Sequence, residues 1–234
     1  MESPAPVPQK YVGYCDILGF SAAVLNDFDG TVSLYRELRE HLRMWPFPAD
    51  AKVSVYSDSI LVVSENLPSV LNTIVSLNWA ALLQGWLIRG GVAYGRYLEE
   101  KEDGNLFVVS DALVHAVAIE KSAKVPAVVV SKDIALGVEA WVPRFEHNIY
   151  RAPLLYFEDR CIVNPFNEYW FKSSVMRVQQ MLEQHPQHHE KYNWFLSLAQ
   201  SVAQDDLLIP ESALKEMLAL GILQEREGSS APAA

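Results

Sequence analysis

Short apolar runs and helical periodicities alternate between residues 11 and 131 of the chain. Runs rich in β-branched and aromatic residues predict strands, whereas apolar residues spaced three and four apart predict helices with one buried face. The expected strands are residues 11–18, 52–57, 60–64, 86–97, 107–109 and 125–131. The expected helices are residues 21–44, 70–83 and 111–122, the first of which is broken near Asp27, Asp29 and Gly30.

The order of these elements indicates the class of fold. It runs strand, helix, strand, strand, helix, strand, and a further helix and strand follow. This order is typical of the ferredoxin-like arrangement, an α+β fold in which helices cover one face of an antiparallel sheet. In that arrangement the first strand and the hairpin of residues 52–64 are neighbours in the sheet.

Beyond about Pro153 the pattern becomes helical. Residues 168–184 and 190–204 predict two amphipathic helices around a His-rich turn, and residues 212–220 predict a third helix that ends at Gly221. The histidines of the turn are metal-ligand candidates, but their spacing around a proline favours an exposed loop. The predicted boundaries are a disordered N-terminus at 1–10, a catalytic sheet domain at 11–152, a helical C-terminal extension at 153–225 and a disordered tail at 226–234.

Composition narrows the choice of partners. The formal net charge is -10, with 29 acidic against 19 basic residues, which argues against a broad basic surface for nucleic acid. The two cysteines, Cys15 and Cys161, lack metal-ligand spacing and suit a reducing compartment. The sequence shows no signal peptide and no uncharged apolar run of about 18 residues. We therefore expect a cytoplasmic protein that binds neither nucleic acid nor a membrane.

Two aspartates lie at neighbouring ends of the predicted elements. Asp16 ends the first strand and Asp58 lies at the tip of the hairpin, so the fold brings the two carboxylates together. Adjacent carboxylates repel and raise each other's pKa unless a divalent cation lies between them. Either aspartate alone is explained by helix capping or by a turn. Their joint occurrence with the strand-to-helix turn at Gly19 favours a Mg²⁺ or Mn²⁺ site for phosphate chemistry.

Three short segments carry the most specific signals. Residues 16–21 read Asp-Ile-Leu-Gly-Phe-Ser, the hairpin tip reads Ser57-Asp58, and residues 89–95 begin with Arg-Gly-Gly and end in glycine. The first closely resembles the Asp-Ile-x-Gly-Phe-[Ser/Thr] motif of class III adenylate and guanylate cyclases. The second resembles their hairpin Gly-Asp, and the third resembles the Arg-x-Gly-x-x-x-Gly segment of their fourth strand. The resemblance extends over residues 11–131.

This resemblance implies a set of site residues, cofactors and partners. Asp16 and Asp58, together with the Ile17 carbonyl, would bind two divalent metal ions, Mn²⁺ or Mg²⁺. The residues that would hold the triphosphate of a nucleoside triphosphate are Gly19, Phe20 and Ser21. The resemblance also implies a homodimer with its active sites at the interface.

Several positions depart from the pattern by which the family reads purines. Its base-reading Lys is replaced by Ser54, and its acidic or polar residue before the third helix is replaced by Phe107. Its transition-state Asn and Arg fall at about Val114 and Ala118. The basic residues that would substitute for them are Arg89 in catalysis, and Arg96, Lys121 and Lys124 in binding the substrate. The alternatives are a cross-strand ion pair for Arg89 and solvated surface charges for the lysines.

Tyr56 bears on the choice of base. In a strand it faces the same side as Asp58 and Ser54, where a bulky phenol would narrow the base pocket. With the hairpin and the Arg-Gly-Gly strand, this resembles the pyrimidine cyclases of bacterial antiphage signalling (Pycsar), which make cyclic CMP or cyclic UMP. For Tyr56 alone, an ordinary strand aromatic is the other explanation.

The function implied by this resemblance is conversion of UTP to 3',5'-cyclic UMP and pyrophosphate, as a second messenger in antiphage defence. Three alternatives stay open at this stage. They are a cytidylate cyclase that makes cyclic CMP, a catalytically degenerate module that binds a nucleotide without turnover, and a purine cyclase with an unusual pocket.

Overall fold

The computed structural model describes residues 6–44, 47–134, 154–166 and 170–204. The chain divides into two compact units. The first consists of Met1–Val142 and Pro153–Pro165, and the second of Pro143–Ala152 and Phe166–Ala234. The candidate residues for metal, catalysis and substrate binding from Asp16 to Lys124 belong to the first, which we call the sheet unit.

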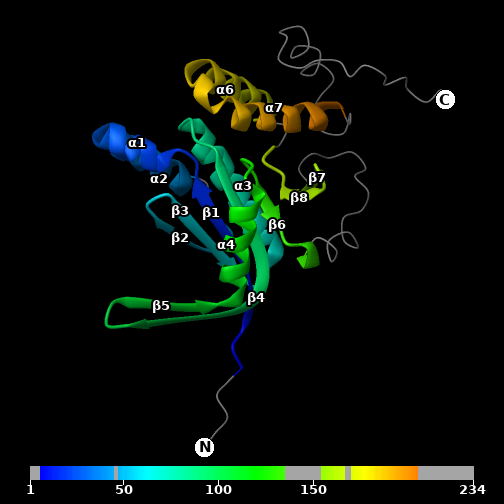
Figure 1. Ribbon diagram of the computed structural model, residues 1–234. Coiled ribbons are helices and arrows are strands. Elements are labelled where there is room, and N and C mark those ends of the chain that lie inside the picture. Colours follow the sequence, from blue (N-terminus) through cyan, green and yellow to red (C-terminus); the bar gives the residue numbers. More distant parts are fainter. Residues whose placement is uncertain (1–5, 45–46, 135–153, 167–169, 205–234) are drawn as a thin grey trace, which may run out of the picture. The chain divides into compact units, whose positions relative to one another are not determined.

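The described residues of the sheet unit form an eight-stranded sheet in the order β2-β3-β1-β4-β6-β8-β7, and β5 pairs with β4 outside this series (Figure 1). The strands are β1 (Gln9–Ile17), β2 (Lys52–Tyr56), β3 (Ser59–Ser64), β4 (Ile88–Glu102), β5 (Asn105–Ser110), β6 (Val128–Val130), β7 (Leu154–Phe157) and β8 (Arg160–Val163). Only β4 and β6 pair in parallel among these described strands, so the sheet is predominantly antiparallel.

The first four strands have the predicted ferredoxin-like order. Helices α1 (Phe20–Asn26) and α2 (Phe28–Met44) connect β1 to β2, and α3 (Leu67–Leu83) connects β3 to β4. The predicted break between the first two helices lies at Asp27, whose carboxylate accepts a hydrogen bond from the Gly30 backbone at 3.0 Å. The prediction of an α+β fold with a ferredoxin-like sheet is therefore confirmed.

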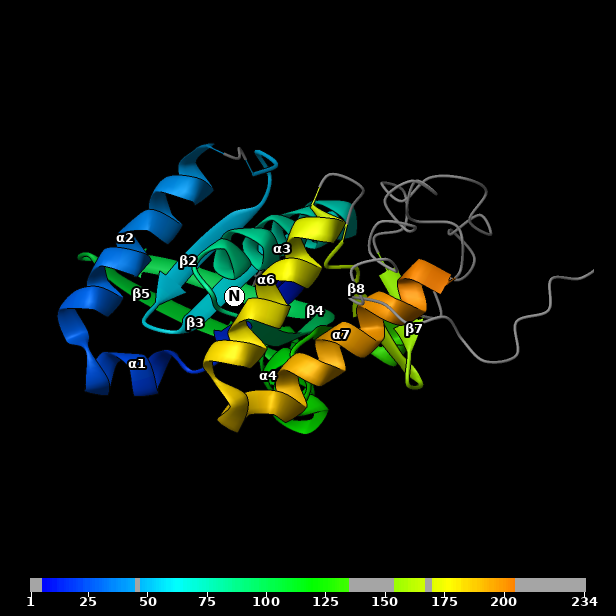
Figure 2. The same cartoon turned by 90° about the horizontal axis from the view of Figure 1, so that it is seen from above.

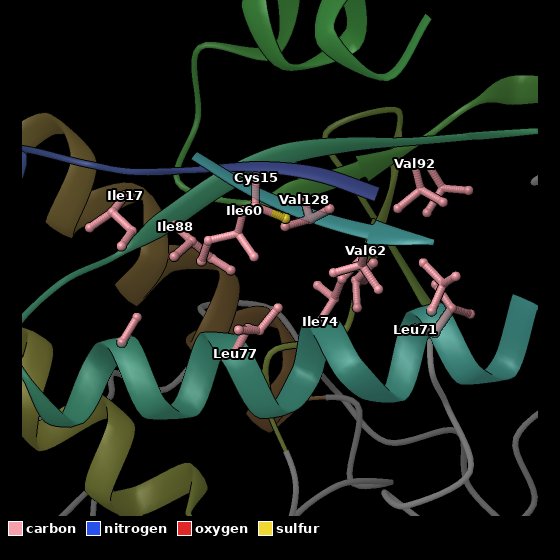
Figure 3. Close-up of a cluster of buried hydrophobic side chains, with 14 of the residues drawn as sticks. Cys15, Ile17, Ile60, Val62, Leu71, Ile74, Leu77, Ile88, Val92 and Val128 are labelled. Atoms are coloured by element: carbon pink, nitrogen blue, oxygen red, sulfur yellow. The ribbon is translucent and has the colours of Figure 1, made fainter. Parts of the chain in front are cut away.

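One face of the sheet is sealed by α3. Side chains in β1 alternate between the two faces, and Cys15 and Ile17 point toward α3, where Ile74 and Leu77 meet them (Figure 3). Helix α2 packs on the same cluster and lies beside β2 and α3 in Figure 2. A Cβ on Gly13 would lie 2.9 Å from the Ile74 Cδ1 atom, so the small residue lets α3 approach the strand closely.

The opposite face carries α4 (Asp111–Ala123), which follows β5 and leads into β6. Gly91 on β4 permits this contact, because a Cβ there would lie 2.2 Å from the Ala116 carbonyl oxygen of α4. The N-terminus of α4 is capped by Ser110, whose hydroxyl accepts from the Leu113 backbone at 3.0 Å. The element order predicts that the helices cover one face of the sheet. This holds for α1 to α3, whereas α4 covers the other face.

Two segments differ from the boundaries expected from the sequence. Residues expected to open the helical extension form the hairpin β7–β8, which joins the sheet where Val129 pairs with Ile162. Cys161 and Val163 are buried in the same core as α3, and Ile162 between them is also buried. At the N-terminus, β1 begins at Gln9, and the Pro8 carbonyl accepts a hydrogen bond from the Tyr97 backbone at 2.9 Å.

The second unit contains α6 (Phe171–Gln184), a 3₁₀ turn (Pro186–His188) and α7 (His189–Gln204), at the positions that the apolar periodicity predicts. Phe166 packs on Phe171 and Phe195 with ring centroids 4.9 and 5.2 Å away. The predicted helix at 212–220 and the predicted tail at 226–234 lie outside the described residues.

Candidate active site

The two aspartates singled out in the sequence meet at one end of the sheet. Asp16 lies near the end of β1, opposite Ser59 of β3 on one side and Arg89 of β4 on the other. Asp58 lies in the two-residue turn between β2 and β3, where Ser57 has a positive φ of 57°. The Ile17 backbone donates a hydrogen bond to the Asp58 carbonyl at 2.9 Å. The end of β1 and the hairpin tip are therefore in direct contact.

A row of side chains runs across four strands at this level. Tyr56 pairs with Ser59, Ser59 with Asp16, and Asp16 with Arg89. Directly opposite residues of paired antiparallel strands lie on the same face of the sheet. Tyr56 and Asp16 are two strands apart, which is about 10 Å at the usual strand spacing. The Ser59 hydroxyl between them is within hydrogen-bond distance, 2.9 Å, of the Tyr14 hydroxyl.

The turn after β1 links the two motifs. Gly19 has a φ of 83°, a left-handed conformation that favours glycine, and no atom lies within 4 Å of the place a Cβ would take. Ser21, in the first turn of α1, donates its hydroxyl to the Asp58 carboxylate at 3.1 Å. Phe20 is buried, with its ring 5.6 Å from those of Tyr35 and Trp86. Only the backbone of Phe20 therefore remains for the predicted triphosphate contact.

Arg89 contacts two carboxylates at the same time. Its Nη2 lies 3.3 Å from Asp16 Oδ2, and its Nε lies 2.5 Å from Glu120 Oε1. The second contact is an ion pair between two buried atoms that have no hydrogen-bond partner within the described residues. Arg89 therefore forms the ion pair across the strands that was its alternative explanation. It also lies beside Asp16, one of the two metal-binding candidates.

Glu120 was missed in the sequence analysis. Its side chain is only 5% exposed, and it lies on the buried side of α4. The signal available in the sequence was an acidic residue within the helical stripe of alanines that packs on β4. The other members of this stripe are Ala112, Ala116 and Ala123.

The charges at the site act on Asp16 in opposite directions. Burial raises the pKa of the Asp16 carboxyl above its ordinary value, and the nearby Asp58 and Glu120 carboxylates raise it further. The Arg89 guanidinium lowers this pKa, but the net direction is upward. Asp16 thus lies near two other carboxylates and one arginine, and a bound cation would relieve the excess of negative charge.

The donor set fits a hard divalent cation. Asp16 and Asp58 offer carboxylate oxygens and Ile17 a backbone carbonyl, since the Ile17 side chain is buried in the core. Mg²⁺ is usually held by one or two carboxylates while waters and substrate phosphates complete its octahedron. In the described part of the chain, no three His, Cys, Asp or Glu side chains are grouped to hold a metal ion. These residues therefore suit a metal site in which oxygen atoms of the substrate and of water complete the coordination.

The remaining predicted site residues lie apart from this row. Arg96 is seven residues beyond Arg89 on β4, about 23 Å along an extended strand. Its Nε donates to Asp111 at 2.7 Å. The structure therefore does not bring Arg96 to Asp16 within one protomer. Lys124 ends α4 with a φ of 54° and follows Glu120 by one helical turn, so it lies at the same end of the helix as the site.

The positions that depart from the purine-cyclase pattern are accessible to solvent. Val114 and Ala118 lie on the exposed side of α4, and Phe107 is 53% exposed on β5. Ser54 and Tyr56 lie on β2, and Tyr56 is 57% exposed. The last six residues of β4 pair with β5 in a two-stranded arm that extends beyond the sheet (Figure 1).

Comparison with known proteins gives structural similarity without sequence similarity. No protein-family model and no curated protein matches the sequence. The structure is similar to the adenylyl cyclase CyaB from P. aeruginosa, with 10% identity, TM-score 0.43, and coverage of 66% of this chain and 91% of the other. It is also similar to the guanylyl cyclase Cya2, with 12% identity, TM-score 0.45, and coverage of 68% and 91%.

A third similar structure is the guanylate cyclase domain of RhGC from Catenaria anguillulae in complex with GTP. Its identity is 14%, its TM-score 0.42, and the coverage is 67% of this chain and 96% of that domain. The functional interpretation therefore rests on the residues of the site. Among the helices of the described residues, none has the length and apolar character needed to cross a membrane.

Proposed function

We propose that this protein is a metal-dependent nucleotidyl cyclase that converts a pyrimidine nucleoside triphosphate to its 3',5'-cyclic monophosphate and pyrophosphate. The observation that carries the proposal is the junction of two motifs. The Ile17 backbone donates to the Asp58 carbonyl at 2.9 Å, and the Ser21 hydroxyl donates to the Asp58 carboxylate at 3.1 Å. The strand end, the hairpin tip and the helix start thus form one polar site beside Arg89.

In the proposed reaction the ribose 3'-oxygen forms a bond with the α-phosphorus, and the bond between the α-phosphorus and the bridging oxygen to the β-phosphate breaks. The 3'-hydroxyl loses its proton to solvent, and pyrophosphate leaves. Divalent ions, when bound, would favour the ionised 3'-oxygen and neutralise the phosphates. Asp16, Asp58 and the Ile17 carbonyl hold these ions, and the Gly19 turn presents backbone N–H groups to the phosphates.

Arg89 and Lys124 supply positive charge at the phosphates. The Nη2 of Arg89 already lies 3.3 Å from Asp16, so its guanidinium reaches the edge of the metal site. Preorganised charge at a transferring phosphoryl group stabilises the transition state. Arg89 is the proposed catalytic residue in place of the family's helix Arg, whose position is the exposed Ala118.

The proposed base is a pyrimidine, with UTP ahead of CTP. Tyr56 lies on the same face as Asp16, two strands away, and its ring narrows the space for a base. The positions where purine cyclases carry Lys and an acidic group hold Ser54 and Phe107. Shape exclusion of a two-ring base discriminates strongly. The choice of UTP, and a role as a messenger in antiphage defence, rest on the resemblance to the Pycsar cyclases.

We further propose a cytoplasmic homodimer with active sites at its interface. The resemblance implies that each site takes groups from both protomers. The exposed apolar residues Phe107 and Val114, on the arm and on α4, are compatible with burial against a second copy.

The direct test is a competition among ATP, GTP, CTP and UTP at equal concentration with Mn²⁺, followed by mass spectrometry of the products. We expect cyclic UMP as the dominant product. A dominant cyclic AMP or cyclic GMP peak would overturn the base assignment, and cyclic CMP would correct it within the pyrimidines.

A second candidate is a module that binds a nucleotide without turnover. The observation that favours it is the absence of the family's transition-state Asn and Arg at Val114 and Ala118. Pyrophosphate release separates the two proposals, because a binding module retains intact triphosphate while a cyclase releases pyrophosphate in equal amount to its cyclic product.

A further inference from the structure

The two carboxylates that contact Arg89 differ in their exposure to water. The Glu120 side chain is 5% exposed, and the Asp16 side chain is 21% exposed. Glu120 Oε1 and Arg89 Nε are buried, and neither has a hydrogen-bond partner within the described residues. The ion pair of 2.5 Å between them is therefore their electrostatic compensation.

This difference in exposure gives the two contacts different roles. A buried carboxylate without a counter-ion is strongly destabilising, so Glu120 needs the guanidinium whether or not a metal ion is bound. Asp16 is more exposed and lies next to the hairpin that carries Asp58, where a divalent cation can take the place of the guanidinium. The contact with Glu120 is permanent in this arrangement, and the contact with Asp16 is exchangeable.

The geometry of the guanidinium supports the same division. Glu120 holds Nε, the nitrogen nearest the aliphatic stem, and Asp16 contacts the terminal Nη2. Because the guanidinium is a rigid planar group, holding Nε also keeps the terminal nitrogens in place beside Asp16, whether or not Asp16 contacts them. The position of Glu120 is fixed by the packing of its helix. One turn before Glu120, Ala116 of α4 lies directly against Gly91 of β4.

We propose that Glu120 is a positioning residue for Arg89. Glu120 holds the guanidinium at the edge of the metal site through Nε, so Asp16 contacts only the terminal Nη2. Asp16 gives up this contact when a metal ion binds. Arg89 then stays beside the site with its terminal nitrogens free for the triphosphate. This proposal rests on the proposed function, since it takes Asp16 and Asp58 as the metal ligands.

The test measures Mn²⁺ affinity of the full chain without nucleotide, by calorimetry and by the electron paramagnetic resonance signal of free Mn²⁺. In Glu120→Gln the arginine has Asp16 as its remaining carboxylate partner and competes with the metal, so we expect affinity to fall about tenfold, as for other groups that support metal ligands. Glu120→Asp keeps the charge but is one methylene shorter, so it should behave like Glu120→Gln. Glu102→Gln makes the same substitution at an exposed glutamate on the β4–β5 arm, and it should change affinity by about twofold or less because exposed charges are screened.

The results distinguish this proposal from a simple effect of charge and from failure of the metal site. Wild-type affinity in Glu120→Asp with reduced affinity in Glu120→Gln would mean that only the charge matters, and would overturn the positioning role. Unchanged or higher affinity in both variants would also overturn it. If Glu120→Gln does not fold, as judged by circular dichroism, Glu120→Asp alone decides. Asp58→Asn tests the site itself: Mn²⁺ affinity equal to wild type in that variant would contradict the proposed function first.

Discussion

The two faces of β1 place residues that are adjacent in sequence in opposite environments. Cys15 points to the face covered by α3, is fully buried, and lies in the main apolar core. Asp16 points to the other face, where it meets Arg89 and the hairpin of Asp58. Because side chains of a strand alternate between its two faces, one of two consecutive residues packs in the core and the other belongs to the candidate site.

The same division continues in the neighbouring strands. Gly90 and Gly91 face opposite sides of β4, and Gly91 admits α4, which brings Glu120 to Arg89. Ile60 of β3 lies in the core, whereas Ser59 belongs to the polar row between Tyr56 and Asp16. Changes on the face of Asp16 should therefore alter turnover, whereas changes on the face covered by α3 should alter the free energy of unfolding.

The largest effect is expected at the metal-binding carboxylates. Asp16→Ala or Asp58→Ala should lower turnover by about a hundredfold or more, because each removes a ligand of the proposed metal ions, which supply the positive charge at the reacting phosphates. Folding should be retained, because the change relieves repulsion between carboxylates in the metal-free protein. Initial rates at saturating Mn²⁺ and circular dichroism check both parts. Turnover within a few-fold of wild type in both variants would contradict the metal assignment.

On the core face, Ile74→Ala should destabilise the protein by about 3 kcal/mol, since it deletes a fully buried side chain and leaves a cavity. Ile74 is 0% exposed and faces β1 at Gly13. Chemical denaturation measures the change. Asn72→Ala, on the exposed side of the same helix, is the matched control and should stay within about 0.5 kcal/mol of wild type.

Tyr56→Ala should change the choice of base more than the stability. Removing the exposed ring opens the space beside Ser59, so the variant should lose most pyrimidine cyclisation or begin to accept ATP or GTP. Tyr94→Ala is the control, since Tyr94 is also exposed but lies on the opposite face, where it packs on Tyr11 at 4.5 Å. A product profile that is the same in both variants would remove Tyr56 from the base pocket.

The face covered by α3 should also protect Cys15 from chemical modification. Burial raises the pKa of the Cys15 thiol to about 12, and the Asp16 and Glu120 carboxylates act in the same direction. We therefore expect no alkylation of Cys15 by iodoacetamide at pH 8 in the folded protein, with full alkylation after denaturation. Peptide mass spectrometry reads the site directly, and rapid labelling of native protein would mean that this face opens.

The smallest effect concerns Asp50, which supports the junction of β3 and α3. Hydrogen bonds from Asn66, Ser64 and Ser69 lower the pKa of its carboxyl to about 2. Because the folded-state pKa is depressed, the stabilisation is present above the unfolded value of about 3.9 and is lost as pH falls toward 2. Wild type should thus be more stable than Asp50→Ala at pH 6, and the difference should shrink between pH 4 and 2. Thermal unfolding of both proteins at a series of pH values measures this difference. A difference in stability that stays constant between pH 6 and 2 would show that the charge of the Asp50 carboxylate does not contribute.

Much of the fold could be predicted from the sequence because its signals are local. Period-2 and period-3.6 patterns placed β1 to β4 and α1 to α3, and their order fixed the ferredoxin-like arrangement. The hairpin β7–β8 was missed, because two strands of four residues each carry little periodicity. The strand character there is decided by pairing with β6.

Short motifs in the sequence were enough to identify part of the site. Asp16, Gly19 and Ser21 lie within six positions, and Asp58 follows from its hairpin turn. The contact of Asp58 with the end of β1, and the pairing of Asp16 with Ser59 and Arg89, depend on strand register, which joins residues more than 30 positions apart. The contact between Glu120 and Arg89, in contrast, required α4 to pack on β4. A short motif fixes only the local backbone geometry. The partner of a buried charge depends on which helix packs on the sheet beside it, as α4 does on β4 at Gly91.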